Sequence, residues 1–190
     1  MRVKQKNHNV HCFGTLGWMP KALQIIYATT SGHTEYVIQA LCEHLENPKS
    51  QESKSQTNSK SQSPNSKNIE VNVKRAELAE AEDFAKGDVL LLACGTWNAM
   101  GREGQLDPHM FVLLNKKAKG IDLAGKQCLV ISLGDDRFKY TARATEHLAN
   151  FINNHGGHML MPPLVIVNDP YGQEEHVTKW GDKLLEKLSS

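Results

Sequence analysis

The sequence predicts an α/β protein with a doubly wound parallel sheet. Apolar runs of strand length recur along the chain, and segments with helical hydrophobic periodicity lie between them. Strands that are apolar on both faces need helices on both sides of their sheet. The 190 residues suffice for one domain with a substantial core, but not for two comfortable ones. Sheets of this class bind ligands beyond the C-terminal ends of their strands, so the informative residues should follow strands.

The pattern of apolar residues predicts each element in turn. Four continuous apolar runs predict strands buried on both faces, at residues 23–28, 89–94, 127–133 and 163–167. Residues 69–74, IEVNVK, alternate apolar and polar side chains, as a half-exposed edge strand does. Helices or helical turns are predicted between the strands, at residues 36–45, 77–84, 110–119, 142–154 and 174–188. Five strands alternating with helices give the doubly wound sheet.

Two segments do not follow this pattern. Residues 49–68 consist almost entirely of Ser, Lys, Gln and Asn, so they are predicted to form a disordered insertion within one domain. Residues 1–22 fit no element; we expect a disordered extension or a misassigned start, because Met19 opens the segment MPKALQIIYATT. The predicted domain is therefore residues 23–190. The cluster HNVHC at residues 8–12 is interpreted as chance rather than as a metal site.

Composition argues against several classes of function. No apolar stretch approaches the roughly 20 residues of a membrane-spanning helix, and none follows the basic N-terminal residues as in a secretory signal. Four widely spaced cysteines fit a reducing cytoplasm. Residues 1–22 carry a net charge of +4 and residues 49–68 one of +3; because the whole chain carries +1, the remainder carries −6. An acidic domain gives no support to a nucleic-acid role.

The loop after the first strand, residues 29–34, reads TTSGHT and contains no lysine or arginine. Backbone N–H groups at a helix N-terminus attract a phosphate without a cationic side chain. Four hydroxyl groups would complete such a cradle, those of Thr29, Thr30, Ser31 and Thr34. Gly32 would let the backbone approach closely. The alternative is a threonine that only caps the following helix. The G-K-S/T ending of an ATP-binding loop is absent, which argues against an NTPase.

The loops after the third and fourth strands carry aromatic residues. Trp97 lies three residues past the last apolar position of its strand, where it either offers a flat face to a planar ligand or covers the end of the sheet. In the later loop, Gly134 and Asp135 permit a tight turn whose backbone could face a ligand. Phe138 and Tyr140 follow; they either flank that ligand or begin the buried face of the next helix.

Together the three loops resemble those of flavodoxins, the small FMN-binding electron carriers. The stretch TTSGHT matches the family pattern S/T-x-T-G-x-T that holds the FMN phosphate, with Ser31 in place of the usual threonine and His33 at a variable position. Residues 96–97 match the family's T-W pair. Residues 134–138 match a G-D turn followed by an aromatic residue, in which Phe138 replaces the more usual tyrosine. The segment WGDKLLEKL also resembles a flavodoxin's last helix.

The resemblance implies a fold, a cofactor and a role. The fold would be a five-stranded parallel sheet of order 2-1-3-4-5 between two helical layers. The protein would bind FMN and act as a monomeric, low-potential one-electron carrier between a flavodoxin reductase and acceptor enzymes, without catalytic or metal-binding residues. Trp97 is expected on the inner flavin face, and Asn98 stands where many members have a glycine whose peptide turns over on reduction. The implied cofactor-binding residues are Thr29, Thr30, Ser31, Gly32, His33, Thr34, Thr96, Trp97, Asn98, Gly134, Asp135, Phe138 and Tyr140.

Charged residues near the expected flavin have opposite effects. Aromatic packing and nearby carboxylates would disfavour the added negative charge of reduced flavin and lower its potential. The carboxylates are those of Glu103, Asp107, Asp135 and Asp136. Arg137 and Lys139 depart from the family's crowding of carboxylates. These two are solvated side chains, or they make the potential less negative, or they form a docking face for an acidic partner.

Two other functions compete with the electron carrier. A flavodoxin-fold quinone reductase or oxidase would need a substrate pocket over the flavin, and the long loop at residues 98–108 could cover one. Alternatively, the chain is a binding module that has lost its flavin, although Ser31 and Phe138 retain the hydroxyl and the ring. No reactive cysteine or histidine–carboxylate constellation in the sequence points to other catalysis.

Overall fold

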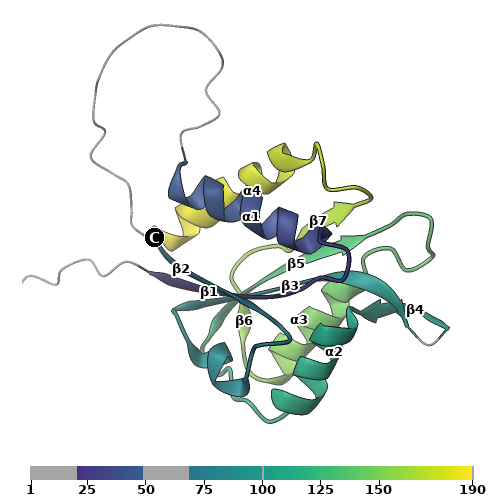
Figure 1. Cartoon of the computed structure of the whole chain (residues 1–190). Coiled ribbons are helices and arrows are strands. Elements are labelled where there is room, and N and C mark those ends of the chain that lie inside the picture. Colours follow the sequence, from purple (N-terminus) through teal and green to yellow (C-terminus); the bar gives the residue numbers. More distant parts are fainter. Residues whose placement is uncertain (1–20, 49–68, 100, 190) are drawn as a thin grey trace, which may run out of the picture.

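The computed structural model describes residues 21–48, 69–99 and 101–189. Within these ranges the chain forms one sheet with helices on both faces (Figure 1). Figure 1 shows α1 (His33–Glu46) and α4 (Glu174–Leu188) over one face of the sheet, with α2 (Pro108–Val112) and α3 (Ala144–Asn154) over the other. The predicted insertion, and all but the last two residues of the predicted N-terminal extension, lie outside the described residues.

The parallel strands follow the order expected from the flavodoxin resemblance. β1 (Ala22–Ala28) lies between β2 (Glu70–Arg75) and β3 (Val89–Ala99). On its other side β3 pairs with β5 (Gln127–Gly134). Strands are therefore confirmed at four of the predicted positions, although their ends differ: residues 23–28, 69–74, 89–94 and 127–133. β1 begins one residue before the predicted domain boundary.

The fifth position of the sheet is filled by two short strands instead of one. β6 (His158–Met159) and β7 (Leu164–Val167) both pair in parallel with β5. Pro162 and Pro163 lie between them and have no N–H group to donate to a neighbouring strand, which explains the break. With this divided fifth strand the parallel order is the predicted 2-1-3-4-5.

The third strand is longer than predicted and turns into a hairpin. β3 continues past residue 94 to Ala99 and pairs in antiparallel fashion with β4 (Arg102–Leu106). Gly101, with φ of 73°, occupies the left-handed conformation at the turn. The sequence pattern missed this extension because residues 95–99, GTWNA, are not an apolar run. The hairpin carries Trp97 beyond the end of the parallel sheet.

The helices differ from the predictions mainly at their ends. α1 begins at His33, three residues before the predicted start, and α3 begins at Ala144, two residues after it. The predicted helix at residues 110–119 is α2 followed by a π-helical segment, η2 (Leu113–Lys117). The helical turn predicted at residues 77–84 overlaps the 3₁₀ helix η1 (Ala81–Ala85). None of the helices formed by the described residues is long and apolar enough to span a membrane.

The core consists of two apolar clusters, one on each face of the sheet. Alternate residues of a strand point to opposite faces, so Leu91 belongs to the cluster under α1 and α4, and Leu90 to the cluster over α2 and α3. Cys94 and Cys128 are fully buried in the second cluster. Burial raises the pKa of the Cys94 thiol to about 12 and that of Cys128 to about 11. Both thiols are therefore protonated and behave as small hydrophobes.

Candidate functional site

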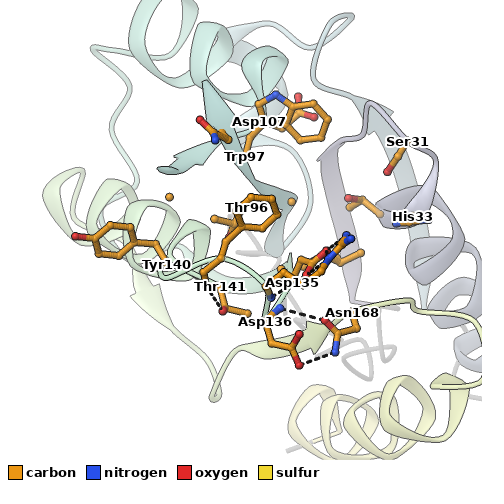
Figure 2. A pocket seen from close by; sticks show the side chains of 18 of the residues that line it. Ser31, His33, Thr96, Trp97, Asp107, Asp135, Asp136, Tyr140, Thr141 and Asn168 are labelled. Atoms are coloured by element: carbon orange, nitrogen blue, oxygen red, sulfur yellow. Dashed lines mark hydrogen bonds and ion pairs between the residues drawn. The ribbon is translucent and has the colours of Figure 1, made fainter. Parts of the chain in front are cut away.

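A cavity of about 680 Å³ lies at the C-terminal ends of β1, β3 and β5 (Figure 2). This is the place where sheets of this class bind ligands, and the volume falls in the range of about 300–1,000 Å³ typical of small-molecule sites. All of the predicted site residues except Gly32 line it. They are Thr29, Thr30, Ser31, His33, Thr34, Thr96, Trp97, Asn98, Gly134, Asp135, Phe138 and Tyr140. Three loops that are distant in sequence therefore meet at one cavity.

The first loop leaves the N-terminus of α1 open. Gly32 is the N-cap residue and has φ of 87°, a conformation that favours glycine. Its N–H group donates to Thr29 Oγ1 at 2.9 Å, which folds the loop into a tight turn. Within residues 21–48, 69–99 and 101–189, no side chain forms a capping hydrogen bond at this end of α1. The alternative of a threonine N-cap is therefore wrong, and the N–H groups of that turn can receive an anion.

The hydroxyl groups of this loop have different surroundings. Thr30 Oγ1 donates to Asp107 Oδ2 at 2.8 Å, so its proton is already committed. Asp107 is only 1% exposed, and its Oδ1 accepts from the His109 N–H at 2.9 Å, at the start of α2. Ser31 is exposed and Thr34 is buried, and both line the cavity. Thr30 thus ties the first loop to the loop that follows the hairpin.

The side chain of Arg75 is hydrogen-bonded to the first loop, and the sequence analysis did not identify this residue. Arg75, at the end of β2, donates through Nη2 to the Thr29 carbonyl oxygen at 3.3 Å and to Glu77 at 2.9 Å. Its Nη1 lies 3.8 Å from Glu35 Oε2, and the other carboxylate oxygen of Glu35, Oε1, accepts from the Tyr27 hydroxyl at 2.9 Å. The sequence did contain a signal for Arg75, because this residue directly follows the strand predicted at residues 69–74, which pairs with the first strand. Neighbouring parallel strands end at the same edge of a sheet, so Arg75 could be expected near the first loop.

The hairpin presents Trp97 and Asn98 to the cavity. Trp97 is half-buried and pairs with Gln105 across the hairpin, next to a shift of register at residues 97–99. Asn98 is exposed, and its φ is not positive, so its backbone needs no unusual conformation here. Thr96 Oγ1 accepts from the Ala144 N–H at 3.1 Å, so this hydroxyl holds the start of α3.

The third loop folds back tightly on itself. A Cβ atom at Gly134 would lie 1.7 Å from the Thr141 carbonyl oxygen, so only glycine fits there. Phe138 and Tyr140 precede α3, which begins at Ala144, so the alternative that they begin its buried face is wrong. Both rings are exposed, Phe138 by 44% and Tyr140 by 40%, and both line the cavity.

Tyr140 forms part of the cavity wall with the hairpin. A Cβ atom at Gly104 of β4 would come within 2.7 Å of Tyr140 Cβ, so the two loops are in close contact. The Arg143 guanidinium lies 4.7 Å from the Tyr140 ring centroid, and Lys139 Nζ lies 5.5 Å from it. Figure 2 shows Tyr140 at one side of the site, with its hydroxyl directed away from the other labelled residues.

Arg137 is paired rather than simply solvated. Its Nε donates to both carboxylate oxygens of Asp135 at 2.9 Å, and its backbone N–H donates to Asp135 Oδ1 at 3.0 Å. These hydrogen bonds hold the pKa of Asp135 at about 2. The guanidinium remains 80% exposed. The positive charge of Arg137 thus offsets one of the carboxylates expected to surround the ligand.

A fourth loop reaches the site and was missed from the sequence. Asn168 and Asp169, which follow β7, line the cavity together with the three predicted loops. Asn168 bonds to Asp136 of the third loop, as the dashed lines in Figure 2 show. The signal was the position of these residues after the fifth predicted strand, where ligand-binding residues are expected.

Comparison with known proteins gives a consistent result. No protein-family model matches the chain. A flavodoxin from Maridesulfovibrio salexigens is 26% identical over 171 residues, covering 90% of this chain and 100% of that protein. A probable flavodoxin 2 from Bacillus subtilis is 27% identical over 154 residues, covering 80% and 85%. These matches support a flavodoxin-family assignment.

Solved flavodoxin structures agree in fold. Oxidised flavodoxin 2 from Bacillus cereus superposes with a TM-score of 0.69 at 22% identity, covering 88% of this chain and 99% of that one. Oxidised flavodoxin 1 from the same organism gives 0.68 at 18% identity, covering 87% and 97%. The flavodoxin-like α/β fold expected from the sequence is thereby confirmed.

Proposed function

We propose that the chain is a flavodoxin-like one-electron carrier that binds FMN in this cavity. The observation that carries the proposal is that one cavity has a helix N-terminus at one end and aromatic rings at the other. One end is the uncapped N-terminus of α1, and the other has the exposed aromatic ring of Phe138 and the half-buried ring of Trp97. FMN joins a phosphate to a planar ring system, and each end of the cavity suits one of these groups.

The donors and the shape of the site fit FMN. At the phosphate end, the N–H groups at the start of α1 have no side-chain cap among the residues that the structure describes, and the Ser31 hydroxyl is exposed, so both can donate to a phosphate. The Glu35 carboxylate beside them accepts from the Tyr27 hydroxyl. At the ring end, Trp97 and Phe138 would flank the flavin and exclude water from it. When bound, FMN supplies the one-electron chemistry; the protein holds it and tunes its potential.

The charges around the cavity favour a low potential. Asp107 is buried at the site, and Glu103 and Asp136 also line it, so added negative charge on the cofactor is disfavoured. Arg137 weakens this effect only in part, because it is bound to Asp135. We expect redox proteins to dock at the open side of the cavity, beside Phe138 and Tyr140. The described cysteines are free, which suits a reducing cytoplasm.

An absorbance spectrum of the purified protein tests the proposal. We expect a flavin spectrum, release of FMN by acid, and two separate one-electron steps during reduction without oxygen. Bound FMN that is reduced in a single two-electron step would favour a quinone reductase or oxidase instead. Failure to bind added FMN would contradict the proposal and favour a module that has lost its flavin.

A further inference from the structure

We propose that the loop between β7 and α4 clamps the two ends of the cofactor cavity together, with Asn168 as the positioning residue for the ring end. This inference rests on the proposed FMN site. Asn168 has φ of 68° and is the only non-glycine residue with positive φ in the part of the chain that the structure describes. Asparagine tolerates this conformation better than most residues, but it still carries a cost that surrounding contacts must offset.

Three hydrogen bonds from Asn168 provide that compensation. Its backbone N–H donates to the Gly134 carbonyl oxygen at 2.8 Å. Its side-chain Oδ1 accepts from the Asp136 N–H at 3.1 Å, and its Nδ2 donates to Asp136 Oδ2 at 2.9 Å (Figure 2). The amide therefore acts as acceptor and donor toward one residue. Aspartate at this position would keep the acceptor but set one carboxylate against another.

The same loop is also attached to the phosphate end. The Tyr171 ring packs against Tyr36 of α1 at 4.5 Å between centroids, and against His33 edge-on at 5.9 Å. The Tyr36 hydroxyl donates to Glu174, whose carboxylate also accepts from the Gly172 N–H at 3.0 Å. His33 lines the cavity beside the hydroxyl cradle. One short loop thus contacts both walls that the ligand must bridge.

The loop is stiff enough to act as a clamp. Gln173 Nε2 donates to the carbonyl oxygens of Val167 at 2.8 Å and Asp169 at 2.7 Å, and the Tyr171 N–H donates to Asp169 at 3.0 Å. By contrast, the side chain of Asp135 bonds only locally, to Arg137. Asn168 therefore links the Gly134–Asp136 backbone to the loop between β7 and α4.

The test compares substitutions that separate backbone strain from hydrogen bonding. Asn168→Gly keeps the left-handed backbone and removes both side-chain bonds, whereas Asn168→Ala removes them and adds strain. We expect Asn168→Gly to raise the dissociation constants of FMN and riboflavin alike, by about fivefold, and to shift the flavin potentials. Asn168→Asp should weaken binding at least as much. Ser31→Ala, at the phosphate end, should weaken FMN but not riboflavin.

Amide exchange distinguishes failure of the clamp from failure of the FMN site. In flavin-free protein, the Asp136 amide should exchange faster in Asn168→Gly than in wild type. Amides elsewhere in the fold should exchange at their wild-type rates. Unaltered flavin affinity, potentials and Asp136 exchange would overturn the clamp. If wild-type protein binds no FMN, the proposed function is wrong, and Asp136 exchange alone then decides whether the clamp exists.

Discussion

Arg75 is a charged residue that acts on the site without lining it. It donates to the Thr29 carbonyl oxygen of the loop proposed to bind the phosphate, and it lies between Glu35 and Glu77. Replacing Arg75 with methionine would free the loop and leave two unbalanced carboxylates near a bound phosphate. We expect a severalfold rise in the FMN dissociation constant and a smaller change for riboflavin, measured by quenching of flavin fluorescence. Lys86→Met removes another paired cation, one that does not line the cavity, and should leave both constants unchanged. Equal losses for the two flavins would exclude a role at the phosphate end.

Substitution of Asn98 tests whether the conformation of one peptide group controls the flavin's reduction potentials. Asn98 lies in the hairpin with an ordinary backbone conformation. Glycine would let the following peptide turn over at little steric cost. We therefore expect Asn98→Gly to widen the separation of the two one-electron potentials in a dithionite titration. Asn98→Ala, which lacks the freedom of glycine, should not. An equal effect of both substitutions would point to the lost side chain instead.

At the scale of elements, η1 is held to β2 by one buried carboxylate. Asp83 is 2% exposed and accepts from Lys74 at 2.7 Å, from Lys86 at 2.7 Å and from the Glu80 N–H at 2.8 Å. Burial favours the neutral carboxyl, but the hydrogen bonds from the two lysines prevail and hold the pKa of Asp83 well below its usual range. The charged form of Asp83 therefore stabilises the folded state.

The sign of this linkage gives a pH prediction. Because the folded pKa is depressed, the contribution is complete above the unfolded pKa near 4 and is lost as pH falls toward the folded value. Asp83→Asn should lower the free energy of unfolding by about 2 kcal/mol at pH 7 and by less at pH 3, measured by urea denaturation. Glu82→Gln, at an exposed neighbouring position, should change it little at either pH. A pH-independent loss in Asp83→Asn would assign its role to packing.

Elements were predictable where one pattern determined them. The apolar runs at residues 89–94 and 127–133 identify β3 and β5, because both faces of these strands are buried. β4 was missed because its sequence, REGQL, has neither an apolar run nor clear alternation, and its pairing depends on the turn at Gly101. Arg75 and Asn168 join the site only through contacts between segments distant in sequence, which no local pattern records.

At the scale of the whole molecule, the predicted insertion can be tested by removal. The described chain stops at Pro48, just after α1, and resumes at Ile69, just before β2. Replacing residues 49–68 with about six Gly and Ser residues shortens only the connection between these elements, and loop closure should become easier by about 1 kcal/mol. We expect unchanged flavin binding and an equal or slightly higher melting temperature.

The control extends the deletion to residues 45–48. It removes Leu45, which is 5% exposed in the core, and should lower the free energy of unfolding by about 2–5 kcal/mol. A comparable loss from the shorter replacement would mean that residues 49–68 belong to the folded domain.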